Sequence, residues 1–189
     1  MEPMTRETPI YKHRQIMKMD EKSIDAALEN AFIQNREFQH LFLTLIDVNP
    51  DEYEYHWSRS DNPWSRIEAV VIDEETGEPE KITRDSETDV IVILQHRHSD
   101  KRLAIHIENK LANGHFTKYQ PQLYPIRAES WKNTDKFQNY SDFVTVLVAP
   151  DAFYHKYSVQ AKPFDHYVSY ESLKDYLPEV QVHLQQFAA

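Results

Sequence analysis

The sequence predicts an α/β fold, with a mixed central β-sheet flanked by helices in a single domain. Two continuous apolar runs, 90–94 and 143–148, are typical of central strands that are buried on both faces. A segment with helical character separates the second run from a further strand at 103–111. Because a helix that joins two strands usually forms a crossover, part of the sheet should be parallel. The 189 residues suffice for one well-packed core.

The N-terminal elements follow from the spacing of apolar residues. Residues 1–19 are polar and mixed in charge, which predicts an arm or loop. Residues 21–46 carry apolar residues at helical spacing, and the polar stretch at 34–37 can divide them into two helices. Residues 47–63 are rich in aromatic and charged side chains, and we expect them to form a loop.

Strand character begins at residue 67. Residues 67–72 and 79–83 are expected to form a hairpin, because the turn between them contains Gly77, which tolerates positive φ. Two further strands are expected at 89–94 and 103–111, and Asn113-Gly114 ends the second of them.

A helix is expected at 116–132, where Pro121 suits the first turn and Pro125 should kink or break the helix. The remaining elements are a strand, a short last strand and a terminal helix, at 143–148, 166–170 and 171–187. Without the return strand at 79–83, the predicted order is α, β, β, β, α, β, followed by β and α.

Composition excludes several classes of protein and of site. No run approaches the ~18 continuous apolar residues of a membrane span, and the N-terminal residues lack the apolar region of a secretory signal. The absence of cysteine excludes disulfides and thiolate metal sites, so we expect a reducing, cytoplasmic environment. The two glycines, Gly77 and Gly114, are too few for a glycine-rich phosphate-binding loop.

Charge is distributed unevenly along the chain. The net charge of −10 argues against a general nucleic-acid coat protein, which would be basic. Residues 51–90 hold 13 acidic and four basic residues, whereas residues 91–140 hold eight basic and four acidic residues. An anionic ligand can therefore dock beside the basic segment. The alternative is charge that is simply scattered and solvated.

The candidate chemistry lies on the strand at 103–111. Successive side chains of a strand point to opposite faces, so His106, Glu108 and Lys110 share one face while the isoleucines between them face a core. Asp89 opens the preceding strand. If the two strands are neighbours, Asp89 and Glu108 can both reach one divalent cation, because Mg²⁺ takes oxygen ligands and retains several waters.

The spacing of these residues resembles the core of the PD-(D/E)XK nuclease superfamily. Asp89 is followed, after 18 residues, by Glu108, Asn109 and Lys110, which match the E-x-K half of the signature. Thr88 stands where the name of the superfamily has proline, a position at which that proline is often missing. The resemblance implies a restriction-endonuclease-like core.

Two further motifs extend the resemblance over residues 25 to 150. Gln120 and Tyr124 match the Gln-x-x-x-Tyr motif that opens the next helix in RecB-like members, and one helical turn separates them, so both can face the sheet. Gln120 would orient the lysine, a water molecule or a phosphate. Glu29 resembles the acidic residue often found on the first helix of these nucleases, and Glu37 is a second candidate for the same role. Alternatively, Glu29 is a solvated carboxylate with no role in the site.

The resemblance implies a nuclease that depends on Mg²⁺, for which Mn²⁺ can substitute. Asp89 and Glu108 would be metal ligands, the backbone carbonyl of Asn109 would add an oxygen, and Glu29 would hold a second metal or a metal-bound water. Lys110 would orient the attacking water or stabilise the transition state. A role for Lys110 as a base would require a depressed pKa.

Nucleic acid, with DNA first, is the partner that the resemblance implies; we expect no membrane association, and a homodimer is left open. The runner-up interpretation is a catalytically inactive nuclease-fold protein that serves as a binding or scaffold protein. The acidic segment 51–90 favours it, because such a segment repels nucleic acid unless it points away. A third interpretation is an unrelated α/β interaction module in which E-x-K is accidental.

Structural alternatives exist for single residues as well. Glu108 and Lys110 can form an exposed ion pair of little consequence, and His106 can touch phosphate or be structural. His96 and His98 form an H-x-H pattern, but no third metal ligand lies at a recognisable spacing.

The same choice applies to basic and aromatic side chains. Lys118, Arg127 and Lys132 can contact a phosphate backbone or be solvated at the surface. Trp57 and Trp64, with nearby tyrosines, can stack on bases or close over a small core.

Overall fold

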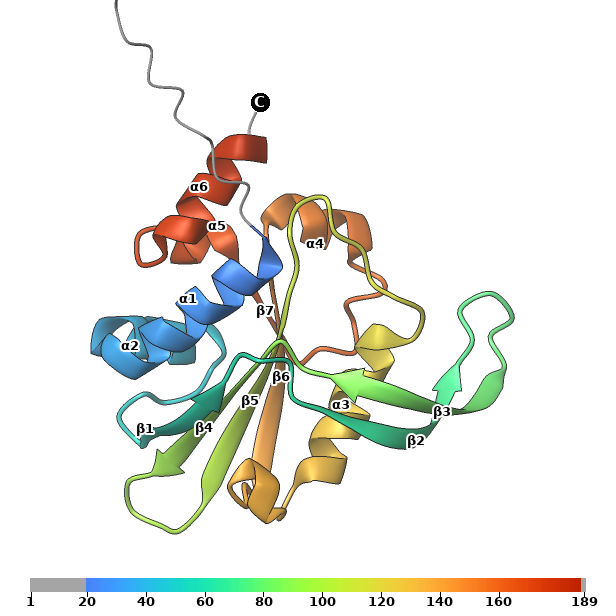
Figure 1. The fold of residues 1–189 in the computed structure, drawn as a ribbon, viewed down its shortest axis with the longest axis horizontal. Coiled ribbons are helices and arrows are strands. Elements are labelled where there is room, and N and C mark those ends of the chain that lie inside the picture. Colours follow the sequence, from blue (N-terminus) through green and yellow to red (C-terminus); the bar gives the residue numbers. More distant parts are fainter. Residues whose placement is uncertain (1–19, 188–189) are drawn as a thin grey trace, which may run out of the picture.

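The computed structural model describes residues 20–187, so the expected arm at 1–19 lies outside the described residues. A five-stranded sheet with the order β1-β4-β5-β6-β7 forms the centre of the molecule (Figure 1). Its strands are Tyr53–Arg59 (β1), Val90–His96 (β4), Arg102–Asn109 (β5), Asp142–Ala149 (β6) and His166–Ser169 (β7). The first three strands are antiparallel neighbours, whereas β5, β6 and β7 run parallel.

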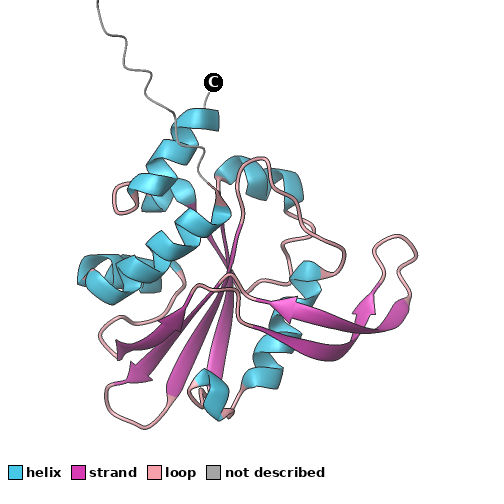
Figure 2. Ribbon diagram, viewed as in Figure 1, coloured by secondary structure: helices cyan, strands magenta, loops and turns pink. Residues whose placement is uncertain are grey.

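Helices cover both faces of this sheet (Figure 2). One face packs against α1 (Glu21–Gln34), α2 (Arg36–Leu45), α5 (Tyr170–Leu173) and α6 (Pro178–Phe187). The other face packs against α3 (Gln120–Trp131) and α4 (Asp151–Tyr157). Because both faces are covered, Val90–Leu94 of β4 and Val146–Ala149 of β6 are apolar and buried at every position. The predicted α/β class with a mixed, helix-flanked sheet is confirmed.

The division of the first helical segment is also confirmed. Asn35 lies between α1 and α2, and its side-chain oxygen accepts hydrogen bonds from the backbone N–H groups of Glu37 and Phe38. Asn35 thus satisfies N–H groups that the start of α2 leaves without partners.

The described residues contain no helix that is long and apolar enough to cross a membrane.

The expectation of a loop at 47–63 is wrong in its central part. Residues Tyr53–Arg59 form β1, the edge strand that pairs with β4. Tyr53, Tyr55 and Trp57 are partly buried, and the residues between them are exposed. This alternation with a period of two was a strand signal that the many charged residues concealed.

The expected hairpin is present as β2 (Trp64–Ile72) and β3 (Pro79–Glu87), and Gly77 in its turn has φ of +73°. These strands form a separate two-stranded sheet. Figure 1 shows the hairpin projecting from the body of the molecule, on the right of the view. Ile67, Ala69 and Val71 of β2 pack against Tyr119 and Leu123, so that one face of the hairpin rests on the α3 region.

Two helix predictions need correction. Residues 171–187 do not form one helix: α5 ends at Leu173, and Pro178 opens α6, because proline suits a first helical turn and not an interior. The helix expected at 116–132 begins only at Gln120, since Tyr119 adopts a left-handed backbone conformation with φ of 66°. Pro125 lies inside α3, and α4 was not predicted.

Candidate active site

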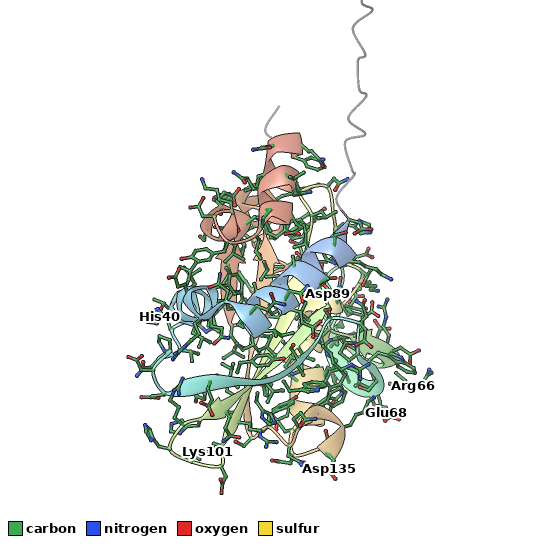
Figure 3. The ribbon with its side chains drawn as sticks, turned by 60° about the vertical axis from the view of Figure 1, so that its left-hand side comes forward. His40, Arg66, Glu68, Asp89, Lys101 and Asp135 are labelled. Atoms are coloured by element: carbon green, nitrogen blue, oxygen red, sulfur yellow. The ribbon has the colours of Figure 1, made fainter. Side chains whose placement is uncertain are left out.

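Asp89 and Glu108 meet at one end of the central sheet. The antiparallel register of β4 and β5 pairs Val90 with Ile107, so Asp89 and Glu108 are the next residues beyond that pair. The prediction that these two strands are adjacent is confirmed. The backbone N–H of Asn109 donates to Asp89 Oδ2 at 2.7 Å, which fixes the carboxylate against β5. Figure 3 labels Asp89 at this end of the sheet, close to α1.

Glu108 is the centre of a group of polar contacts. It is 1% exposed, although it lies near the end of its strand. Lys110 Nζ lies 2.5 Å from Glu108 Oε1, and Gln120 Nε2 donates to the same oxygen at 2.6 Å. Since Gln120 is the first residue of α3, the start of that helix brings the amide to the carboxylate. The exposed ion pair considered from the sequence is excluded by this burial.

Tyr124 lies one helical turn after Gln120 and is fully buried. Its hydroxyl donates to the carbonyl oxygen of Ile107 at 3.2 Å, next to Glu108 in the chain. Both residues of the Gln-x-x-x-Tyr pattern therefore face the sheet at β5, as their spacing predicts.

Burial and mutual repulsion change the proton affinity of the two carboxylates. Burial raises the pKa of Asp89 well above its ordinary value, and the negative charges of Glu108 and Asp25 raise it further. Burial also raises the pKa of Glu108, against the opposing effect of the Lys110 ammonium group. A cation beside such carboxylates favours their ionised forms.

The Lys110 side chain is held in its protonated, positively charged form. Burial alone would lower the pKa of its ammonium group, but the carboxylates of Glu108 and Asp89 outweigh burial, and the pKa is raised. A lysine whose pKa is raised does not act as a general base near neutral pH. The geometry therefore favours Lys110 as a positive charge that orients water or stabilises developing negative charge.

A third carboxylate, that of Asp25, approaches from α1 and was not predicted. It is buried, and its Oδ1 accepts a hydrogen bond from Asn109 Nδ2 at 2.7 Å. The Asn109 side-chain oxygen in turn accepts a hydrogen bond from the Tyr170 hydroxyl at 2.5 Å. Burial raises the pKa of Asp25 to about 7, and the neighbouring charges of Glu108 and Glu21 act in the same direction.

A signal for Asp25 was present in the sequence. Asp25 shares one stripe of α1 with Leu28 and Phe32, which follow at three and seven residues and are fully buried. Carboxylates are rare at such core positions unless they are paired. An acidic residue on the apolar stripe of a helix therefore indicates a buried polar site.

Glu29, which the resemblance selected on the same helix, has different neighbours. Ser58 Oγ donates to its Oε1 at 2.8 Å, and the hydroxyl of Ser60 donates to its Oε2. Within residues 20–187, Asp25 and not Glu29 is hydrogen-bonded to the E-x-K segment. A metal-binding role for Glu29 stays a prediction, and Asp25 is the better-placed acidic residue of α1.

Arg127 is neither a solvated surface residue nor an exposed contact for phosphate. It is fully buried, its guanidinium carbon lies 3.9 Å from the ring centroid of Tyr124, and Nη1 donates to Ser86 Oγ at 2.8 Å. In the described part of the chain, Nε and Nη2 have no hydrogen-bond partner. The positive charge of Arg127 helps to keep Glu108 ionised.

The other two basic candidates are already paired. Lys118 Nζ lies 2.8 Å from Asp73 of the hairpin turn, and Lys132 Nζ lies 3.4 Å from Glu129. Contact of either lysine with a phosphate would compete with these carboxylates, so neither is a preformed anchor for nucleic acid.

His106 belongs to the core. The Tyr140 hydroxyl donates to the carbonyl oxygen of Ala128 at 2.5 Å, so it accepts from His106 Nε2, which lies 3.1 Å away. The imidazole is fully buried beside Trp131 and Phe143. Burial lowers the pKa of His106 well below its ordinary value, which keeps the ring neutral. These contacts support the structural alternative for His106.

The residues at the end of β4 and β5 fit a cation of the magnesium type. Mg²⁺ is typically held by one or two carboxylates and keeps several waters, and two buried carboxylates with raised pKa values are what Asp89 and Glu108 offer. No group of three His, Cys, Asp or Glu side chains suited to a metal is found within residues 20–187. A cation here would therefore depend on two carboxylates, a main-chain oxygen and water.

Comparison with known proteins returns no relative: no protein-family model, no curated protein and no solved structure matches this chain.

Proposed function

We propose that this protein is a metal-dependent nuclease that hydrolyses phosphodiester bonds, with DNA as the first candidate substrate. One observation carries the proposal: Asp89 and Glu108 lie opposite each other on adjacent strands, and Lys110 and Gln120 both contact Glu108. Carboxylates can hold a cation, and a fixed positive charge can stabilise the negative charge that develops during phosphodiester hydrolysis.

The order of elements supports the same proposal. Helix α1, strands β1, β4 and β5, helix α3 and strand β6 follow the order α-β-β-β-α-β that the resemblance to PD-(D/E)XK nucleases implies. The β2–β3 hairpin is then an insertion between the first and second strands of that core. On this basis we propose a restriction-endonuclease-like core for the chain.

Each side chain has a defined part in the proposed reaction. Asp89 and Glu108 would hold the cation, which when bound stabilises negative charge and makes a coordinated water more acidic. Lys110, which stays protonated, would orient the attacking water and stabilise the charge that develops on phosphate. Gln120 holds the Glu108 carboxylate in place, and Asp25 holds the Asn109 side chain.

The inactive scaffold remains the second candidate, and the position of the acidic residues weighs against it. Five acidic residues of segment 51–90 lie in and next to the hairpin turn, at Asp73, Glu74, Glu75, Glu78 and Glu80. This turn is at the far end of the hairpin from Asp89, which follows β3 directly. These five acidic residues therefore lie away from the proposed catalytic end of the sheet, whereas Asp85 and Glu87 line the cavity beside it.

A cleavage assay tests the proposal. Single-stranded DNA, double-stranded DNA and RNA are incubated with the wild type, Lys110→Ala and Lys101→Ala in Mg²⁺ or Mn²⁺. Lys101 is an exposed lysine in the β4–β5 turn and serves as the matched control (labelled in Figure 3). We expect cleavage by the wild type and Lys101→Ala, and cleavage that is roughly 10²–10³-fold slower by Lys110→Ala. A wild type that is inert on all three substrates would favour the scaffold.

A further inference from the structure

An open cavity of about 470 Å³ lies beside the proposed active site, between the β2–β3 hairpin and the start of α3. This volume is within the range of small-molecule sites, roughly 300–1,000 Å³. Its lining includes Trp64, Arg84, Asp85, Glu87 and Gln120, and the Asp85 carboxylate lies 3.3 Å from Arg66 Nη1. Because Gln120 also holds Glu108, a ligand in this cavity would adjoin the position of bond cleavage.

Trp64 gives the cavity an aromatic surface. Its side chain is 57% exposed, whereas Trp131 is buried and Trp57 is partly buried. In the described residues, no hydrogen bond engages its indole N–H. Exposed aromatic rings beside a nucleic-acid path stack with unpaired bases, and this contact tolerates any base.

Glu87 adds hydrogen-bonding specificity beside that ring. It is the cross-strand partner of Trp64, so the two side chains emerge on the same face of the hairpin. Among residues 20–187, Glu87 makes no ion pair or side-chain hydrogen bond, whereas its neighbour Asp85 is 3.3 Å from Arg66. The Glu87 carboxylate is therefore available to accept hydrogen bonds from a ligand.

A carboxylate discriminates among bases because it only accepts hydrogen bonds. The Watson–Crick edge of guanine presents two adjacent donors, N1–H and N2–H, which match the two oxygens of a carboxylate. Adenine and cytosine place an acceptor nitrogen beside their amino group, and thymine offers one N–H between two carbonyls. Glu87 therefore favours guanine over the other three bases.

Arg84 supplies positive charge to the same cavity from the other face of the hairpin, because it pairs with Ile67, which rests on the α3 region, whereas Glu87 pairs with Trp64. Its Nη1 donates to the carbonyl oxygen of Lys118 at 2.6 Å, which fixes the guanidinium without neutralising it. No carboxylate pairs with Arg84 in the described part of the chain. A fixed, unneutralised guanidinium is suited to a phosphate of the same nucleotide.

We propose that this cavity is a subsite for one unpaired nucleotide, with guanine preferred, and that the substrate is a single-stranded or locally unpaired nucleic acid. A base inside a duplex has its faces stacked and its Watson–Crick edge paired, so it cannot enter such a site without leaving the helix. The inference rests on the proposed nuclease function and deepens it by naming the substrate class.

The subsite is tested with mononucleotides, which contain no bond between nucleotides to cleave. Binding of dGMP, dAMP, dCMP and dTMP to the metal-free protein is measured by titration calorimetry. We expect dGMP to bind best, Trp64→Ala to weaken it about tenfold or more, and Trp64→Phe to retain most of it. Val70→Ala, an exposed apolar residue further along the same face of β2, is the matched control and should bind as the wild type does.

A second pair of variants tests the choice of base. Glu87→Gln should abolish the preference for dGMP, because an amide offers one acceptor and one donor in place of two acceptors. Glu78→Gln, in the hairpin turn, should leave the preference unchanged. Unaltered dGMP binding by Trp64→Ala, or an unaltered preference in Glu87→Gln, would overturn the proposal.

The outcome is separable from that of the nuclease assay. A protein that binds dGMP through Trp64 but cleaves no nucleic acid would support the subsite and contradict the nuclease function alone. A nuclease whose nucleotide binding ignores Trp64 would contradict the subsite alone.

Discussion

His106 and Glu108 lie two residues apart on the same face of β5, and both side chains are fully or almost fully buried. Their surroundings differ. His106 meets aromatic rings and one hydroxyl, and it remains neutral. Glu108 meets an ammonium group, an amide and a second carboxylate, so opposing charges converge on it. Burial of a polar side chain alone therefore does not identify a site, whereas convergence of charges does.

The two regions also differ in what they do to stability. A neutral histidine brings no charge into the core, although His106 Nδ1 has no hydrogen-bond partner within residues 20–187. Buried carboxylates with raised pKa values favour the unfolded state when they are ionised, because water solvates them better. Such a group at one end of the sheet therefore lowers the stability of the fold while it is ionised.

The largest expected effect is at the charged end of β5. Lys110 offers no ligand oxygen, so Lys110→Ala should keep metal binding while cleavage falls by roughly 10²–10³-fold, the loss typical for one preorganised group. Glu108→Ala should lose both metal binding and cleavage. Parallel cleavage and calorimetric measurements check this, and full activity of Lys110→Ala would show that the site lies elsewhere.

The next effect concerns the cation itself. We expect Mg²⁺ and Mn²⁺ to bind the wild type in the micromolar-to-millimolar range, as oxygen-only sites that retain water often do. Asp89→Ala should bind neither ion measurably in titration calorimetry. Asp100→Ala, an exposed carboxylate in the β4–β5 turn, is the control and should bind as the wild type does. Equal binding by Asp89→Ala would remove Asp89 from the site.

A smaller effect is expected on stability. The folded protein raises the pKa of Asp25 from 3.8 to about 7, so the stability that its protonated form supports is present below about pH 3.8 and is lost as pH rises towards 7. Asp25→Asn should therefore increase the free energy of unfolding of the metal-free protein most above pH 7 and least near pH 4. Urea unfolding at several pH values measures this; a gain that does not depend on pH would contradict the argument.

The smallest effect on activity is expected for His106→Leu, in the aromatic surroundings of β5 away from the charged end. This substitution should leave cleavage unchanged but alter the response of stability to acid. Because folding lowers the pKa of His106, its contribution is complete above about pH 6.5 and is lost as pH falls towards the depressed pKa. The stability of His106→Leu should thus fall less with decreasing pH than that of the wild type. The exposed control His56→Gln should show the same fall as the wild type.

Much of the fold could be predicted because residues 90–94, and residues 146–148 of the run 143–148, are apolar and buried. The edge strand β1 escaped prediction because only one of its faces packs on the core, so aromatic and polar residues alternate. The break at Pro178 depends on a local rule for proline that could have been applied.

The candidate site divides in a similar way. Asp89, Glu108 and Lys110 could be predicted together from strand pairing and alternation, and Gln120 was selected by the resemblance to the Gln-x-x-x-Tyr motif. Asp25 reaches the site only through packing of α1 across the sheet. No local spacing encodes that approach, although its place on an apolar stripe was visible.

A crystal structure of the wild type soaked in Mn²⁺ tests the central claim most directly, because the anomalous signal locates the ion. The account predicts a peak between Asp89 and Glu108, with both carboxylates as ligands and Lys110 moved away from Glu108 Oε1 or sharing it. No peak at this position at millimolar Mn²⁺, with the Lys110–Glu108 ion pair unchanged, would contradict the proposed metal-dependent site.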